Sequence, residues 1–187
     1  FFFTEEGERE ATDIVRHIMP PIYTMVGISP FARHQTKLWG TENMDKLMRL
    51  INAHHKVVFC LFGGPDDIKG LEAIAARFHN CYIMAGRHDL AAELALICRL
   101  SLMISMDSAN MHLAALSGIS TVSIWGGTHP AMGFAPVGGQ KHIIVQTPNS
   151  ELGCRPCTVY GRGECIRKDL KYKCLEEIKP EAVYERI

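Results

Sequence analysis

Residues 101–130 read SLMISMDSANMHLAALSGISTVSIWGGTHP. An apolar run over residues 100–105 leads into a polar turn, and a helical pattern follows from about residue 108 to 116. Residues 121–125 form a second apolar run, rich in the β-branched side chains that favour strands. Two continuous apolar strands joined by a helix are typical of a parallel sheet that is buried on both faces.

The same alternation of strands and helices extends along most of the chain. We expect further strands at residues 23–28, 57–62, 81–84 and 142–145. The first expected helix covers residues 5–19. Further helices are expected to follow N-caps at Thr41, at Asp66 or Asp67, and at Asp89. The predicted fold class is therefore α/β, a Rossmann-like doubly wound parallel sheet with helices on both faces.

The composition changes once along the chain, where cysteines gather near residues 150–175. We therefore expect a helix and interdomain linker at residues 1–22, a Rossmann-like domain at 23–150, and a cysteine-rich tail with a C-terminal helix at 151–187. The chain begins Phe-Phe-Phe-Thr, without Met or a signal-peptide pattern, so we expect it to be a piece of a longer protein.

Charge and motifs exclude several classes of protein. The 187 residues include 20 basic and 20 acidic side chains, and this balance argues against a nucleic-acid binder. No apolar run approaches the length of about 18 residues that a transmembrane helix needs. The sequence has no G-x-G-x-x-G after its first strand, no G-x-x-x-x-G-K-[ST] and no G-x-S-x-G. These absences count against a dehydrogenase, a P-loop NTPase and an α/β-hydrolase.

Polar or glycine-rich loops follow four of the expected strands, and parallel strands end at one edge of a sheet, where ligands bind. The candidate binding residues in these loops are Ser29, Lys37, Gly63, Gly64, Asp67, Asp107, Ser108, Ala109, His112 and Thr128. Asp107 or Ser108 is expected to cap the following helix, and the free N–H groups of its first turn would form an anion site. Lys37 can add a point charge for a diphosphate, and Asp67 can accept hydrogen bonds from ribose hydroxyls. The same residues also fit plain caps, turns and a solvated lysine, so the set is a hypothesis for a phosphorylated, ribose-bearing ligand.

The tail carries cysteines in the pattern C-x2-C-x7-C-x8-C, formed by Cys154, Cys157, Cys165 and Cys174. A C-x-x-C pair is a good chelate for zinc, whereas the second pair is loosely spaced. Structural zinc, disulfides and free thiols are therefore three alternatives for this tail.

The segments at the strand ends also fall in a recognisable order. They are residues 29–39, 62–65, 85–87, 107–115, 118 and 122–130. Their order and spacing resemble the signature of the family 9 glycosyltransferases, the ADP-heptose:lipopolysaccharide heptosyltransferases. The resemblance covers about residues 23–175. It implies the C-terminal, donor-binding domain of a GT-B enzyme, which has two Rossmann-like domains with the active site between them.

The resemblance also implies roles for the candidate residues. Lys37 would contact the diphosphate, Asp67 would lie near the ribose, and Asp107 would face the donor sugar. The phosphate site would be lined by Ser108, Ala109 and His112, with Thr128 beside the donor. The chain departs from the family pattern at four positions, which leaves the donor sugar open. These are Ala109 in place of glycine, Asn110 in place of proline, and Gly127 and His129 in place of proline and aspartate.

The chemistry implied is sugar transfer from an ADP-sugar to a lipid-linked saccharide acceptor. Negative charge develops on the leaving diphosphate, where preorganised cations and amides stabilise it without a catalytic cofactor. The general base is expected in an N-terminal domain outside this chain, so no catalytic residue is assigned. We expect a cytoplasmic protein, peripheral at the inner face of the inner membrane. A GT-B-type nucleotide-sugar epimerase and a non-catalytic, zinc-stabilised binding module are the alternatives.

Overall fold

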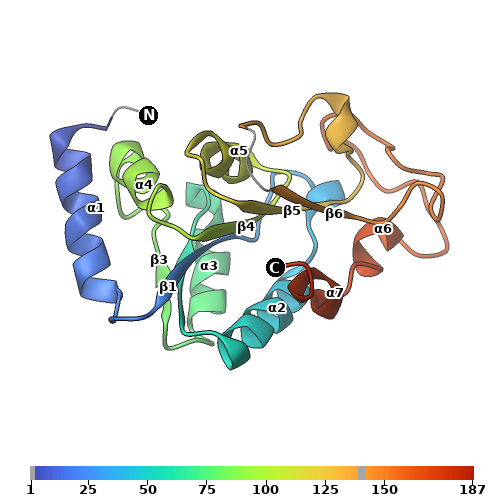
Figure 1. Cartoon of the computed structure of the whole chain (residues 1–187). Helices are drawn as coiled ribbons and strands as arrows, with labels where there is room; N and C mark the ends of the chain where they lie inside the picture. Colours follow the sequence, from blue (N-terminus) through green and yellow to red (C-terminus); the bar gives the residue numbers. More distant parts are fainter. Residues whose placement is uncertain (1–2, 139–141) are drawn as a thin grey trace.

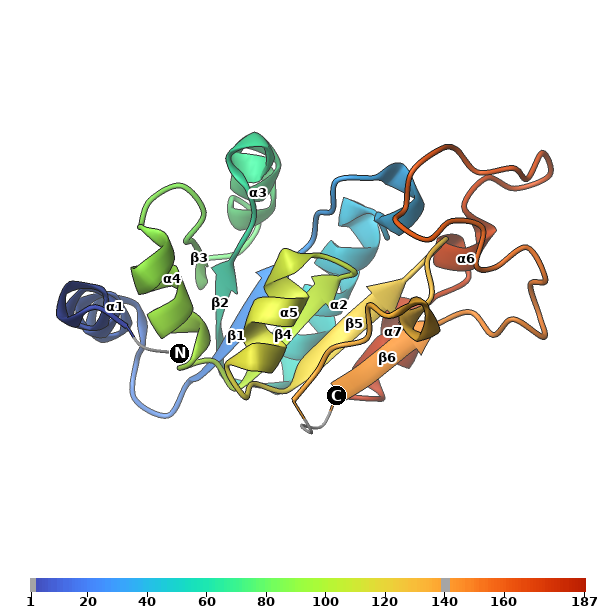
Figure 2. The ribbon, with the colours of Figure 1, turned by 90° about the horizontal axis from the view of Figure 1, so that it is seen from above.

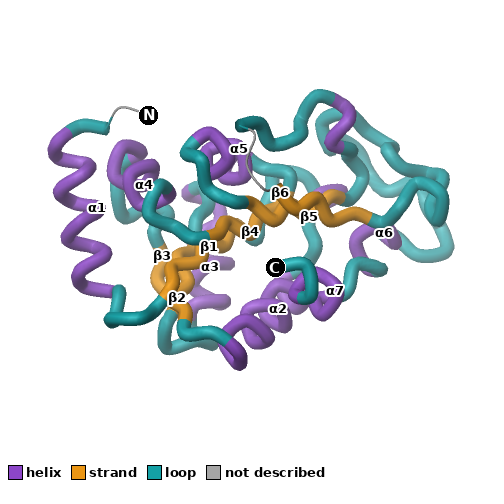
Figure 3. The backbone as a smooth tube through the Cα atoms, viewed as in Figure 1, coloured by secondary structure: helices purple, strands orange, loops and turns teal. Residues whose placement is uncertain are grey.

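The computed structural model describes residues 3–138 and 142–187. Its centre is a six-stranded parallel sheet with strand order β3-β2-β1-β4-β5-β6 (Figure 3). The strands are β1 (Thr24–Ser29), β2 (Val57–Leu61), β3 (Cys81–Ile83), β4 (Leu102–Met106), β5 (Thr121–Trp125) and β6 (His142–Gln146). All six lie where the apolar runs predicted them, within about two residues at each end. The predicted α/β fold class is confirmed.

Helices cover both faces of the sheet (Figures 1 and 2). They are α1 (Glu5–Ile18), α2 (Thr41–His54), α3 (Ile68–Ala75), α4 (Leu90–Ile97), α5 (Ala109–Leu116), α6 (Lys173–Glu176) and α7 (Pro180–Tyr184). Short 3-10 turns follow three of the strands: η1 (Gln35–Lys37), η2 (Pro65–Asp67) and η3 (Pro130–Met132). None of the helices in the described residues combines the length and the apolar character that crossing a bilayer requires.

The pleat of the strands divides the core into two layers, because successive side chains point to opposite faces. In β2, Phe59 and Leu61 pack into a cluster with α2, α3, α6 and α7. Val58 and Cys60 pack into the other cluster, with α1, α4 and α5. Helix α1 therefore belongs to the same layer as α4, against which it packs.

The tail also contributes to the core. Leu175, Ile178 and Val183 are buried in the cluster beneath α2, and Trp39 Nε1 donates a hydrogen bond of 2.9 Å to the Ile178 carbonyl. Residues 151–187 differ in composition from the rest of the chain, yet their helices complete one face of the sheet.

Local details of the helix starts differ from the sequence prediction. The N-cap of α2 is Gly40 and not Thr41, and Thr41 is already the first helical residue. Asp89 does cap α4, since its carboxylate accepts a hydrogen bond of 2.7 Å from the Ala92 amide. At α5 the N-cap residue is Ser108, whose side chain makes no capping hydrogen bond.

Candidate functional site

An open cavity of about 740 Å³ lies at the carboxyl ends of the strands. Its lining brings together these predicted residues: Ser29, Lys37, Gly63, Gly64, Asp67, Asp107, Ser108 and Ala109. The remaining two are not part of this lining: Thr128 donates a hydrogen bond to Asp107, and His112 interacts electrostatically with Asp107 and Lys37. The cavity therefore joins the loops after β1, β2 and β4, as the topology of a parallel sheet predicts.

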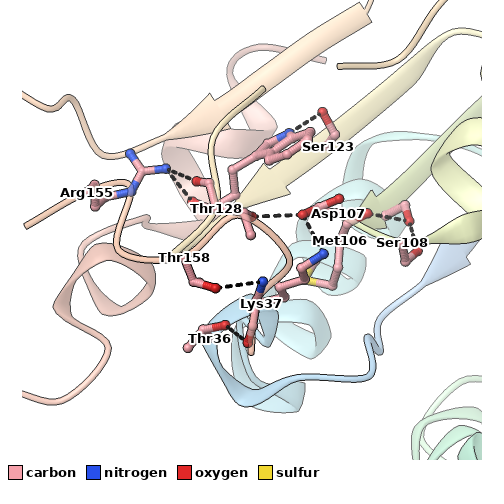
Figure 4. A network of polar contacts seen from close by, with 12 residues as sticks. Thr36, Lys37, Met106, Asp107, Ser108, Ser123, Thr128, Arg155 and Thr158 are labelled. Atoms are coloured by element: carbon pink, nitrogen blue, oxygen red, sulfur yellow. Dashed lines mark hydrogen bonds and ion pairs between the residues drawn. The ribbon is translucent and has the colours of Figure 1, made fainter. Parts of the chain in front are cut away.

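The centre of the cavity wall is an ion pair that the sequence did not predict (Figure 4). Lys37 Nζ lies 2.7 Å from Asp107 Oδ2, and both side chains are largely buried. Thr128 Oγ1 donates a hydrogen bond of 2.8 Å to the same Asp107 oxygen, and Thr128 is fully buried. Lysine and threonine thus hold one carboxylate from two sides, at the point where η1, β4 and β5 end.

The N-terminus of α5 forms a second part of the wall. The Asp107 side chain is engaged by Lys37 and Thr128, and the Ser108 hydroxyl lies 2.9 Å from the Ser105 hydroxyl. Neither predicted cap therefore occupies the first-turn amides of α5, which corrects the expectation of a side-chain cap here. A helix start of this kind, with a small Ala109 side chain, presents N–H groups and the positive end of the helix dipole to an anion.

Asn110 fastens this helix to the neighbouring strand. Its Nδ2 donates a hydrogen bond of 2.9 Å to Ser29 Oγ at the end of β1. Ser29 is buried, so the contact fixes the distance between the loop after β1 and the start of α5. Asparagine is one of the departures from the family pattern, and here it gives the wall an additional hydrogen bond.

The loop after β2 contributes a carboxylate near the cavity rim. Asp67 Oδ2 accepts a hydrogen bond of 2.8 Å from the Gly64 amide, and so closes the η2 turn. The other oxygen of the carboxylate is not part of this bond. Asp67 can therefore hold the turn and still accept a hydrogen bond from a hydroxyl group of a ligand.

His112 lies on α5, within electrostatic range of the ion pair. Burial lowers the pKa of His112, the Asp107 carboxylate raises it, and the Lys37 ammonium lowers it. The net direction is downward, so the imidazole is neutral at pH 7 and can act as a hydrogen-bond partner without adding charge.

The tail supplies a wall of the cavity that the sequence prediction missed. Tyr160 lines the cavity, and the Gly161 carbonyl accepts a hydrogen bond of 2.6 Å from Thr36 Oγ1. Gly161 has φ 88°, and a Cβ built on it would lie 2.5 Å from Lys37 Cε. The Lys37 stem therefore runs beneath the tail backbone. In the sequence, the only sign of this contact between the tail and the cavity was an aromatic residue, Tyr160, beside Gly161 and Arg162.

Of the three alternatives for the tail cysteines, the described structure has the free thiols and not the zinc site or the disulfides. All four cysteines are free thiols, and no group of three or more His, Cys, Asp or Glu side chains within residues 3–138 and 142–187 is arranged to hold a metal ion. Each of three thiols faces a different partner: Cys157 Sγ the Gly127 carbonyl, Cys165 Sγ the Tyr172 amide, and Cys154 Sγ the Arg167 guanidinium. Burial raises the pKa of the fourth, Cys174, to about 11. The residues as arranged do not fit a zinc ion.

Comparison with known proteins gives a consistent result. The model of glycosyltransferase family 9 (heptosyltransferase) matches residues 8–162. The lipopolysaccharide core heptosyltransferase OpsX of Haemophilus influenzae is 25% identical over 119 residues, which are 63% of this chain and 34% of OpsX.

Solved structures share the fold. ADP-heptose lps heptosyltransferase II of E. coli has a TM-score of 0.73 and 20% identity, over 99% of this chain and 51% of that one. A family 9 glycosyl transferase of Veillonella parvula has a TM-score of 0.77 and 22% identity, over 99% and 51%. The chain thus spans about half the length of these structures and about a third of OpsX.

Proposed function

This chain belongs to glycosyltransferase family 9, and from that premise we propose that it is the donor-binding half of a heptosyltransferase. The donor would be an ADP-sugar, and the sugar transferred would be heptose or a close relative. The observation that carries the proposal is the convergence of Lys37, Asp107 and the start of α5 on one cavity at the strand ends. OpsX and the E. coli enzyme are both named as heptosyltransferases, which supports the choice of reaction.

The groups in the cavity suit a leaving diphosphate. When the bond between sugar and diphosphate breaks, negative charge grows on the phosphate oxygens, and groups fixed in advance stabilise it without reorganising. Lys37 would supply a positive charge, and the first-turn amides of α5 would supply hydrogen bonds. The neutral imidazole of His112 would donate a hydrogen bond to the diphosphate.

The ion pair suggests how the donor is recognised. Lys37 Nζ and Asp107 Oδ2 form an ion pair of 2.7 Å. A diphosphate competes for the lysine, which leaves the Asp107 carboxylate able to accept hydrogen bonds from sugar hydroxyls. Thr128 keeps Asp107 in place during this exchange, because its hydrogen bond does not depend on Lys37.

We also propose the parts of the reaction that lie outside this chain. A general base must take the proton of the acceptor hydroxyl, and we assign it to another domain of the whole protein. The acceptor would be a lipid-linked saccharide of the lipopolysaccharide core, and the protein would work at the cytoplasmic face of the inner membrane. This chain alone should bind the donor and transfer no sugar.

Ligand-dependent stability tests the proposal directly. Thermal unfolding of the chain is followed with ADP, UDP, GDP and CMP, each with and without EDTA. A ligand that binds only the folded state adds RT ln(1 + [L]/Kd), about 2.7 kcal/mol at a hundredfold excess over Kd. We expect a shift with ADP that exceeds the others and persists in EDTA. Equal shifts with all four nucleotides, or none with any of them, would contradict an ADP-sugar site.

A transfer assay tests the reaction itself. The whole protein, an ADP-heptose donor and a lipopolysaccharide core acceptor should yield ADP and a lengthened saccharide. The same mixture without acceptor should release no ADP and leave the donor unchanged. Conversion of the sugar in the absence of acceptor would point to an epimerase instead.

A further inference from the structure

Arg155 is a buried cation with only neutral partners. It is 5% exposed, and its guanidinium donates to backbone carbonyls of two segments and to the Gln146 amide oxygen. The carbonyl acceptors are those of Gly126 (2.5 Å), Thr128 (3.0 Å), Trp125 (3.4 Å) and Thr147. No carboxylate within the described residues forms an ion pair with it. Burying a charge without a counterion lowers the free energy of unfolding. A residue kept in such a place is therefore expected to serve a function that offsets this cost.

The segment that Arg155 holds is the loop after β5. Gly126 fits only because it lacks a side chain, since a Cβ there would collide with the Thr36 carbonyl and with Leu175. The Gly127 amide donates a hydrogen bond of 2.8 Å to the Thr36 carbonyl, and the Cys157 amide donates one of 2.9 Å to the Gly127 carbonyl. The loop is therefore clamped between η1, which carries Lys37, and the cysteine-rich tail.

This loop ends at Thr128, the residue that holds Asp107. Figure 4 shows Arg155 on one side of Thr128 and Asp107 on the other. The Thr128 carbonyl accepts from Arg155 at 3.0 Å, while its hydroxyl donates to Asp107 at 2.8 Å. A single residue thus connects the buried guanidinium to the carboxylate, and Arg155 itself does not line the cavity.

We propose that Arg155 is a positioning residue of the donor site, which fixes the backbone of Thr128 so that its hydroxyl holds Asp107 where the donor sugar binds. Arginine suits this role because its planar fork offers five donors, which satisfy several carbonyls in one plane, whereas lysine offers a single point charge. The inference rests on the proposed function, in which Asp107 contacts the sugar and Lys37 and α5 contact the diphosphate. The effect of Arg155 should therefore appear in the affinity for the sugar portion and not in that for the nucleotide.

The test is calorimetric titration of the whole protein with two probes, ADP and ADP-heptose. We expect Arg155→Met to weaken ADP-heptose binding about tenfold, in line with the loss of a well-placed hydrogen bond to a charged group, while the Kd for ADP changes less than about twofold. Arg155→Lys should lie between the methionine variant and the wild type. Lys168→Met removes another cation of the same tail, one that is exposed, and should bind both probes like the wild type.

A double-mutant cycle shows whether the effect passes through Thr128. Thr128→Val should reproduce the selective loss of ADP-heptose affinity, and Arg155→Met combined with Thr128→Val should lose no more than Thr128→Val alone, because both remove one linked interaction. Thr128→Ser keeps the hydroxyl and should retain the wild-type ratio of the two affinities. If Arg155→Met fails to fold by circular dichroism, Arg155→Lys takes its place in the cycle.

The outcomes separate the two proposals. Equal weakening of ADP and ADP-heptose, wild-type affinity in Arg155→Met, or an additive cycle would overturn the positioning role while leaving the donor site intact. A wild-type protein that binds neither probe would instead refute the proposed function.

Discussion

The loops at the strand ends and the cysteine-rich tail both line the cavity, but they are held in different ways. Each loop follows a strand of a parallel sheet, so the register of the sheet brings Ser29, Asp67 and Asp107 to one edge. The tail contains no strand within its described residues. It is held by the burial of Leu175, Ile178 and Val183 and by hydrogen bonds across the sequence, such as those from Thr36 to Gly161 and from Trp39 to Ile178.

The difference teaches where each region is sensitive to mutation. A loop at a strand end keeps its position as long as the sheet folds, so its substitutions should change binding chemistry with little effect on stability. The tail is positioned by side-chain contacts with the rest of the fold, so substitutions at those contacts should change stability and binding together. The predictions below test this contrast, from the largest expected effect to the smallest.

Lys37→Ala should give the largest change in activity. In the proposed function the variant removes the charge that faces the diphosphate, while Thr128 still donates its hydrogen bond to Asp107. By analogy with the loss of one preorganised group that stabilises developing charge, we expect kcat/KM of the whole protein to fall about a hundredfold. Lys69→Ala, an exposed lysine on α3, is the control and should retain wild-type activity. A loss below threefold in Lys37→Ala would remove the lysine from the donor site.

Trp39→Phe should give a large change in stability by loosening the tail. The ring stays buried, but the Ile178 carbonyl loses the hydrogen bond of 2.9 Å from the indole Nε1. An unsatisfied buried acceptor costs on the order of 1–3 kcal/mol. Chemical denaturation should show a loss of about 2 kcal/mol, together with weaker ADP binding as the tail loosens. A stability loss without any change in ADP affinity would mean that the tail and the cavity are independent.

The contrast also explains what could be predicted from the sequence. Apolar runs located all six strands, and parallel topology then implied that the loops carrying Lys37, Asp67 and Asp107 would meet. Those inferences rest on periodicity and on the geometry common to all parallel sheets. They do not depend on which side chains pair, and for that reason they survive errors such as the N-cap at Gly40 in place of Thr41.

The pairings themselves could not be predicted. Lys37 and Asp107 are far apart in sequence, and the pattern of neither segment shows that they share an ion pair. Tyr160 and Arg155 lie in the tail, whose cysteine spacing suggests a metal site. The tail contributes to the cavity through Tyr160 and through the contact of Arg155 with the Thr128 backbone. Spacing shows what a cluster can chelate, but the orientation of each thiol depends on tertiary contacts.

Gly161→Ala tests the point where the tail meets the loops. A Cβ there would lie 2.5 Å from Lys37 Cε, and the positive φ of 88° is unfavourable for alanine. The left-handed conformation alone costs on the order of 1–2 kcal/mol. We expect about 2 kcal/mol lower stability and a several-fold weaker affinity for ADP, because Lys37 must shift. Gly153→Ala, in the same tail with open space around it, should change neither quantity.

The smallest expected effect is the pH dependence contributed by His112. Burial lowers the pKa of this histidine in the folded state, so the unfolded chain binds more protons as the pH falls below the ordinary histidine value of about 6.5. Its contribution to stability is therefore complete above that pH and is lost as the pH falls toward the folded pKa. Thermal unfolding at pH 7.5 and 5.5 should show a smaller pH-dependent loss in His112→Gln than in the wild type. A bound diphosphate would favour the protonated ring, so saturating ADP should shrink this difference. If ADP leaves it unchanged, His112 does not face the phosphates, and the anion site is limited to Lys37 and the start of α5.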